Sequence, residues 1–159
     1  IVHIVCCYAF HALVTGPKSF FGWMGIPHSK VLDRLPDSIS LLHALCVALL
    51  CALCEEDIGH YFPNTDPRWK DAPSRVFLEE AARQIALRRG RIVNVDATVI
   101  AEAPKIYPHL AEMKQRIATA LGVAEKLIGV KATTNERMGF IGREEGIAAM
   151  AVASVDLPE

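Results

Sequence analysis

The sequence has 159 residues, a formal net charge of −1 and 52% hydrophobic residues. This length predicts a single domain spanning residues 1–159, with enough chain to bury a hydrophobic core. A charge so close to zero argues against a broad binding surface for nucleic acid or for anionic membranes, so we expect neither as a partner. The high hydrophobic content favours an additional buried surface, such as a subunit interface. Five cysteines, an odd number, favour free thiols in a reducing compartment.

The first third of the chain predicts two strands and a long helix. Residues Val2 to Val14 are rich in β-branched and aromatic side chains and predict a strand, which a turn at Gly16-Pro17 would end. A second, irregular strand is predicted from Phe20 to Ile26 and a polar loop from Pro27 to Pro36. A helix is predicted from Pro36 to Cys54.

The run from Leu41 to Cys54 is apolar except for His43. Its 14 residues fall short of the roughly 20 that a membrane-spanning helix needs. We therefore expect a helix buried in the core or at an interface. A membrane-associated or interaction protein built around this run is the weaker alternative.

The remaining elements alternate between helices and strands. Helical apolar spacing, a serine at the start and a glycine at the end predict a helix from Ser74 to Arg89. The other predicted elements are a strand from Arg91 to Ala101, a helix from Pro108 to Leu121, a strand from Leu127 to Ala132 and a strand from Ile147 to Val155. This order predicts an α+β fold in which a single mixed sheet is covered on one side by helices.

The segment from Lys131 to Gly146 concentrates groups suited to phosphate and metal. Its three glycines, 139, 142 and 146, permit tight turns and close approach to a ligand. The hydroxyls of Thr133 and Thr134 are possible donors to phosphate, and Arg143 offers a planar fork to it. Glu136 is a suitable ligand for magnesium, which uses one or two carboxylates beside phosphate oxygens. A charged surface loop is the alternative for this segment alone.

Two more segments complete a recognisable pattern. One is Asp57 to Pro67, with the letters DIGHYFPNTDP, and the other is Ala101 to His109, with the letters AEAPKIYPH. Together with Lys131 to Ile147 they resemble the 2-C-methyl-D-erythritol 2,4-cyclodiphosphate synthase family of the non-mevalonate isoprenoid pathway. That family carries DIG, FPDTDP, APK and KATTxExxGFxGRxEGI in this order. The resemblance covers the whole chain and is strongest from about Asp57 onward.

The resemblance implies an enzyme, a phosphorus–oxygen lyase, that acts on a cytidine diphosphate ester. It would convert 4-CDP-2-C-methyl-D-erythritol 2-phosphate to the 2,4-cyclodiphosphate and release CMP, by metal-assisted attack of the 2-phosphate on the diphosphate. It also implies a homotrimer around a central axis, with active sites between neighbouring subunits. The expected location is a bacterial cytoplasm or a plastid stroma.

The resemblance also implies a role for each matched residue. The methylerythritol portion would contact Asp57, Ile58 and Gly59, under a loop formed by Phe62, Pro63, Asn64, Thr65 and Asp66. The cytosine pocket would comprise Ala101, Ala103, Pro104, Lys105, Ile106 and Tyr107, largely through backbone groups. Thr133 would support the nucleotide phosphates, the catalytic Thr134 would stabilise the transition state, and Glu136 would hold magnesium. Asn135 would also contact the substrate. Phe140 and Arg143 match positions near the site and the trimer axis.

The family further implies a zinc ion held by an Asp-x-His pair and a helix histidine. His11 and His43 stand at the histidine positions, but Ala9 replaces the aspartate. A catalytic zinc usually has three protein ligands, so this site is expected to be weakened. Leu35-Pro36 also replaces a His-Ser pair that grips the diphosphate. The alternative is therefore a catalytically impaired relative that binds cytidine nucleotides as a trimer, with the two histidines as ordinary core residues.

The cysteines are possible substitutes for the missing ligand. Cys46 follows His43 by about one helical turn, and Cys6 and Cys7 precede His11 closely. Cys54 is too far along the helix from His43 to share an ion with it, at roughly 16 Å for a rise of about 1.5 Å per residue. We expect all five cysteines to serve as small apolar filler, because free cysteine is among the most buried residue types.

Overall fold

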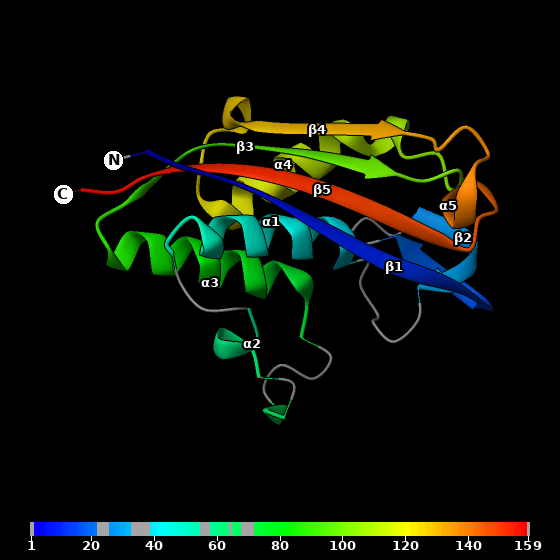
Figure 1. Ribbon diagram of the computed structural model, residues 1–159, viewed down its shortest axis with the longest axis horizontal. Helices are drawn as coiled ribbons and strands as arrows, with labels where there is room; N and C mark the ends of the chain where they lie inside the picture. The colour runs from blue at the N-terminus through cyan, green and yellow to red at the C-terminus, as the bar shows by residue number, and fades with distance from the viewer. Residues whose placement is uncertain are drawn as a thin grey trace.

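The computed structural model describes residues 2–21, 26–32, 39–54, 58–63, 65–67 and 72–158, with no description of side chains at 7–32, 39–40, 58 and 74. Five strands form one sheet in the order β2-β1-β5-β3-β4 (Figure 1). Their bounds are β1 Val2–Phe21, β2 Ile26–Leu32, β3 Arg91–Ile100, β4 Ile128–Thr133 and β5 Gly146–Asp156. Only the β3–β4 pair is parallel, so the expected single mixed sheet is confirmed.

The helices of the described chain lie mainly on one side of this sheet (Figure 1). They are α1 Ile39–Cys51, α2 Ile58–Tyr61, α3 Ser74–Leu87, α4 Leu110–Leu121 and α5 Gly139–Gly142, with 3-10 turns η3 at Tyr107–His109 and η4 at Glu125–Leu127. Helix α1 packs on β1 and β5, α4 packs on β4, and α3 packs on both helices. The α+β class follows from this single helical layer on one sheet.

The two faces of the sheet differ sharply in burial. Val95, Ala97 and Val99 of β3 are almost completely buried. Their partners on β5, residues 153, 151 and 149, are alanines that are also buried. These small side chains let α1 approach the sheet closely. On the first strand, Val2 and Ile4 remain 53% and 69% exposed, so part of the opposite face is apolar and uncovered.

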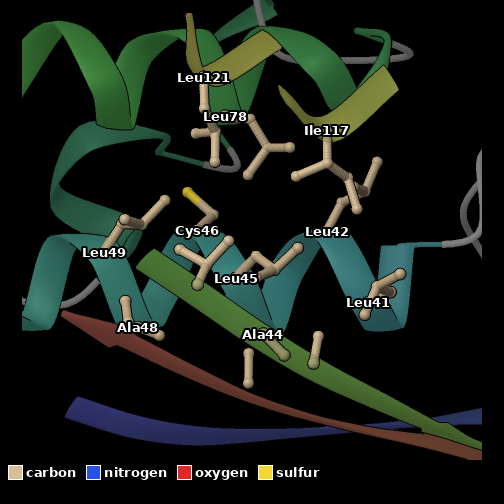
Figure 2. Packing of buried hydrophobic residues seen from close by; sticks show 14 of the residues in the cluster. Leu41, Leu42, Ala44, Leu45, Cys46, Ala48, Leu49, Leu78, Ile117 and Leu121 are labelled. Carbon is tan, nitrogen blue, oxygen red and sulfur yellow. The ribbon is translucent and has the colours of Figure 1, made fainter. Parts of the chain in front are cut away.

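Helix α1 is apolar and buried around most of its circumference, apart from one half-buried line of residues that includes His43. Figure 2 shows Ala44 and Ala48 directed toward the strands, while Cys46 and Leu49 are directed toward the layer formed by α3 and α4. Leu45 and Leu49 have no exposed surface. The apolar run is therefore the centre of the core, as expected. No helix in the described part of the chain has both the length and the apolar character to cross a membrane.

Several elements agree with the sequence-based expectation to within a few residues: α3, β3, α4, β4 and β5. Gly122 ends α4 as expected, with a left-handed φ of 65°. The start of α4 is later than predicted because Tyr107–His109 forms a 3-10 turn before Leu110.

The prediction for the first two strands is wrong in its boundaries. Strand β1 continues to Phe21 through Gly16-Pro17, and a shift in register between Thr15 and Ser19 takes the place of the expected turn. Between the pairs formed by these two residues, β1 contains two residues more than β2, and such an irregularity disrupts the pairing locally without ending the strand. The second strand begins at Ile26, where the predicted strand was expected to end, and continues to Leu32 through residues predicted as a polar loop. Because β2 is an edge strand, it tolerates polar side chains and a proline at position 27.

Candidate active site

The carboxyl ends of β3 and β4 lie side by side and carry two of the three sequence motifs. In this parallel pair Ile100 is opposite Thr133, and the backbone N–H of Ala101 donates to the carbonyl of Thr133 at 3.0 Å. The segments 101–107 and 133–138 therefore leave the sheet at the same edge. Ligands of α/β sheets commonly bind beyond the carboxyl ends of parallel strands. This juxtaposition makes the edge a candidate binding site.

A tight turn follows β4 and contains the hydroxyl and carboxylate groups of the motif. The Thr134 hydroxyl donates to Glu136 Oε1 at 3.1 Å, and the amide of Asn135 side chain donates to the Met138 carbonyl at 2.8 Å. Glu136 and Arg137 have positive φ values of 50° and 61°. Two successive non-glycine residues in this region store backbone strain, which occurs preferentially at functional sites.

The turn is closed from behind by α5. The N–H of Gly142 donates to the Met138 carbonyl at 2.9 Å. A Cβ added at Gly142 would lie only 2.6 Å from the Cα and the carbonyl oxygen of Arg137. No side chain fits there, so glycine is required by space at this position. The fixed backbone leaves Thr133, Thr134 and Glu136 exposed at the edge of the sheet.

The segment after β3 combines two buried apolar residues with exposed and half-buried ones. Ala101 and Ile106 are buried at 6% and 3% exposure, whereas Lys105 is exposed and Tyr107 is 80% exposed. The peptide bond between Ala103 and Pro104 is cis. Glu102 accepts hydrogen bonds from the backbone N–H groups of Asn135 and Arg137 at 3.0 and 2.8 Å. The two segments are therefore joined beyond the sheet as well as within it.

The charged end of the long motif is internally paired. Arg143 donates from Nε and from a terminal guanidinium nitrogen to the two carboxylate oxygens of Glu145, at 2.8 and 2.9 Å. This fork-to-fork pair raises the pKa of Arg143. Phe140 is 41% exposed. The guanidinium proposed from sequence as a phosphate ligand is thus already held by a carboxylate within its own chain.

The residues expected to hold zinc come from β1 and α1. His11 is opposite Ile147 and Ala9 is opposite Ala149 in the β1–β5 pair, and α1, which carries the half-buried His43, packs on both strands. Their backbones thus belong to adjoining elements. The side chains of Ala9 and His11 are outside the described set, as are Leu35 and Pro36 altogether. Among the described side chains, no three His, Cys, Asp or Glu residues are grouped to hold a metal ion.

The third motif is only partly described. Asp57 and Asn64 are outside the described residues, Ile58 and Gly59 begin α2, and Thr65 is exposed. Phe62 is buried at 8% and packs edge to face on Phe77 of α3, with ring centroids 4.7 Å apart. Phe62 therefore anchors this motif to the core. Figure 1 shows α2 on the far side of α3, away from the ends of β3 and β4.

The buried thiol of Cys46 is unsuited to replace a metal ligand. Its Sγ donates to the carbonyl of Phe77 at 3.5 Å, on the side of α1 that faces α3. Burial, with a smaller effect of the Glu80 carboxylate, raises the pKa of the Cys46 thiol to about 12. A metal ligand must be a thiolate. Cys46 is therefore a neutral core residue, as expected from sequence. The same expectation is wrong for Cys6 and Cys54, which are exposed.

Cys46 should resist alkylation in the native protein at pH 8, because the thiolate is the reactive form and this thiol is buried and neutral. The raised pKa also means that its contribution to stability is present below pH 9 and is lost as the pH rises from 9 toward 12. Mass spectrometry after iodoacetamide treatment measures the alkylated and unmodified fractions of each cysteine. Cys54 is the internal control, since it should react in the folded protein. Equal labelling of the two cysteines in native protein would contradict the expectation.

Sequence reasoning did not identify Glu102 or the pairing partners at this edge. Glu102 lies within the AEAPK motif, beside the proposed nucleotide pocket, and this position was the one sequence feature that could have identified it. Lys131 also pairs with Asp96 across β3 and β4. A side chain added at Gly129 would collide with that same aspartate. These contacts join residues at least 33 positions apart, which periodicity does not reveal.

Comparisons with known proteins agree with this geometry. The family model described as "YgbB family" matches residues 2–156. A protein of Thioalkalivibrio sulfidiphilus named 2-C-methyl-D-erythritol 2,4-cyclodiphosphate synthase is 48% identical over 149 residues, which cover 94% of this chain and 93% of that one. The bifunctional enzyme IspD/IspF of Mesorhizobium japonicum is 47% identical over 95% of this chain. The chain spans only 37% of the length of that bifunctional relative.

Solved structures extend the similarity to the fold. The CDP complex of IspF from Plasmodium falciparum has a TM-score of 0.81 and 28% identity, over 99% of this chain and 97% of that one. The bifunctional IspDF of Campylobacter jejuni has a TM-score of 0.85 and 29% identity, over 100% of this chain and 43% of that one.

Proposed function

The chain belongs to the YgbB family of 2-C-methyl-D-erythritol 2,4-cyclodiphosphate synthases, and we propose that it carries out their reaction. The substrate is 4-CDP-2-C-methyl-D-erythritol 2-phosphate, and the products are the 2,4-cyclodiphosphate and CMP. The observation that carries the proposal is the junction of the segments 101–107 and 133–138 at the end of the parallel strands. Complexes of related proteins with CDP support a cytidine nucleotide as the ligand, and we propose this edge as its site.

The reaction needs positioning more than a protein nucleophile. An oxygen of the 2-phosphate attacks the β-phosphorus, the bond between that phosphorus and the bridging oxygen breaks, and the bridging oxygen leaves on CMP. Exposed hydroxyls of Thr133 and Thr134 would donate to the phosphate oxygens on which negative charge gathers. The Thr134 hydroxyl donates to Glu136 in the structure, so it would have to turn from that carboxylate to the phosphate when the substrate binds. Holding the two phosphates in line would contribute several kcal/mol, of order 7–11 at best.

A magnesium ion fits the donor set at the turn. Glu136 presents an exposed carboxylate beside the Thr134 hydroxyl, and magnesium binds through one or two carboxylates together with phosphate oxygens. Glu136 would hold the ion, which would neutralise diphosphate charge when bound. The zinc set does not fit equally well, because Ala9 supplies no ligand beside His11 and His43. We propose that any metal at these histidines is weakly held.

The Ala9→Asp variant should retain more zinc than the wild-type protein, because it restores a third protein ligand beside the two histidines. Elemental analysis after exhaustive dialysis measures zinc per chain. Ala124→Asp is the matched control, since it adds the same carboxylate at an exposed position before β4. Unchanged zinc content in Ala9→Asp would mean that residue 9 does not adjoin the metal site. Full occupancy in the wild type would mean that another ligand compensates.

A homotrimer would reunite the divided motifs. In one chain, α2 lies away from the ends of β3 and β4 (Figure 1). Neighbouring copies would bring the methylerythritol contacts of one chain to the nucleotide contacts of another. The exposed apolar side chains of Val2 and Ile4 support burial of the open sheet face in such an assembly. Light scattering after gel filtration would test the trimer.

The second candidate is an impaired relative that binds cytidine nucleotides without turnover. It is favoured by Ala9 and by Leu35-Pro36, where the resembled family has a metal ligand and a diphosphate-gripping pair. Both candidates keep the nucleotide half of the site. Both therefore predict binding of cytidine nucleotides, and only the synthase predicts turnover.

One assay separates the two candidates. The protein is incubated with the cytidylyl substrate and magnesium, with and without added zinc, and CMP is measured by chromatography. Enzymatic release of CMP supports the synthase. CDP binding without CMP release supports the impaired relative, and absence of both would overturn the nucleotide site itself.

A further inference from the structure

Glu102 forms the most direct link between the two segments of the site. A single carboxylate oxygen, Oε1, accepts from the backbone N–H of Asn135 at 3.0 Å and from that of Arg137 at 2.8 Å. Both donors belong to the turn after β4, and the acceptor belongs to the segment after β3. Glu102 is itself half-buried, which strengthens hydrogen bonds to its charge.

The anchored amides flank the residue proposed to hold magnesium. Glu136 lies between Asn135 and Arg137, and its own N–H is directed to the Thr134 hydroxyl at 3.4 Å. Backbone with the φ values of Glu136 and Arg137 is unfavourable for side chains with a Cβ and persists only when surrounding contacts enforce it. Successive N–H groups in such turns form anion-binding concavities. In this chain the anion bound by the N–H groups of Asn135 and Arg137 is the Glu102 carboxylate.

We infer that Glu102 is a positioning residue that holds the 134–138 turn ready for the diphosphate. The inference rests on the proposed function for the identity of the ligand. Glu102 belongs to the segment that would hold the base. Its two hydrogen bonds fix the backbone on either side of Glu136. Glu102 acts through the turn and does not need to touch the substrate. Its removal should weaken recognition of the β-phosphate more than recognition of the base.

Two variants of Glu102 separate its hydrogen bonds from its charge. Glu102→Ala removes the acceptor, whereas Glu102→Gln keeps a carbonyl oxygen at the same position without the charge. Glu125→Ala is the matched control, because Glu125 is exposed in η4 at the opposite end of β4. Calorimetry with CMP and with CDP plus magnesium gives the affinity gained from the β-phosphate in each protein.

In Glu102→Ala the affinity for CDP should fall about tenfold more than the affinity for CMP, the effect expected for losing hydrogen bonds to a charged acceptor. Glu102→Gln should recover most of that loss, and Glu125→Ala should match the wild type. Equal losses for CMP and CDP in Glu102→Ala, or no recovery in Glu102→Gln, would overturn the inference.

Amide exchange provides a readout that does not depend on the ligand. The N–H groups of Asn135 and Arg137 should exchange faster in Glu102→Ala and regain protection in Glu102→Gln. Unchanged exchange in Glu102→Ala would overturn the positioning role even if affinity fell. A wild-type protein that binds neither nucleotide would contradict the proposed function, while the exchange rates would still decide whether Glu102 holds the turn.

Discussion

Glu136→Gln should lower the rate of CMP release by about 100-fold or more, the loss typical of removing one group that stabilises transition-state charge. The substitution keeps an oxygen able to accept from the Thr134 hydroxyl, which lies 3.1 Å from Oε1 in the native turn. What it removes is the negative charge proposed to hold magnesium on the diphosphate. The loss should therefore be catalytic, with the turn itself preserved.

Binding measurements distinguish this cause from damage to the turn. Affinity for CDP without magnesium should remain within about threefold of the wild type, and the gain in affinity on adding magnesium should disappear. Glu125→Gln serves as the control, since it neutralises an exposed carboxylate at the other end of β4. A Glu136→Gln variant with near-normal turnover, or one that still responds to magnesium in binding, would remove Glu136 from the metal site.

Local patterns in the sequence were sufficient for the elements that carry the nucleotide half of the site. The sequence predicts a strand from Arg91 to Ala101, and β3 runs from Arg91 to Ile100 with Val95, Ala97 and Val99 buried. Gly122 ends α4 because glycine adopts the left-handed conformation without steric cost. Where local preference and tertiary packing agree, as they do from Ser74 onward, a pattern in the chain predicts the element.

The first strands show what such patterns leave out. Proline at position 27 and the polar residue types near it suggest a loop, yet the backbone from Ile26 to Leu32 pairs with β1 at the edge of the sheet. An edge strand needs hydrogen bonds on one side only, so its composition is weakly constrained. Its position depends on the partner strand, which the local composition does not specify.

The same limit applies within the site. Thr134 and Glu136 can be proposed from the sequence because their functional groups lie within one short motif. The acceptor that holds their backbone, Glu102, lies 33 and 35 positions from its donors and is brought to them only by the parallel pairing of β3 and β4. The pairing of Arg143 with Glu145 likewise alters the expected role of the arginine, and it depends on side-chain geometry.

Gly142→Ala should reduce CMP release by about 100-fold, because a displacement of about 1 Å in a positioned group is enough for a loss of that size. The added Cβ would lie 2.6 Å from the Cα and carbonyl oxygen of Arg137. These are backbone atoms, which cannot move aside as the end of a flexible side chain can. Arg137 is held at a φ of 61° and donates its N–H to Glu102 at 2.8 Å. Relief of the clash must shift the residue next to Glu136.

Gly122→Ala separates this effect from a general cost of replacing glycine. Gly122 has a φ of +65°, and an added Cβ there would meet nothing within 4 Å. The control therefore introduces backbone strain of about 1–2 kcal/mol without a collision, and it should lower the melting temperature while leaving turnover near the wild-type value. If Gly142→Ala loses far more activity than Gly122→Ala at a similar loss of melting temperature, the collision acts by displacing the turn. Equal activity in the two variants would mean that the turn tolerates movement and that Glu136 is not held by the backbone behind it.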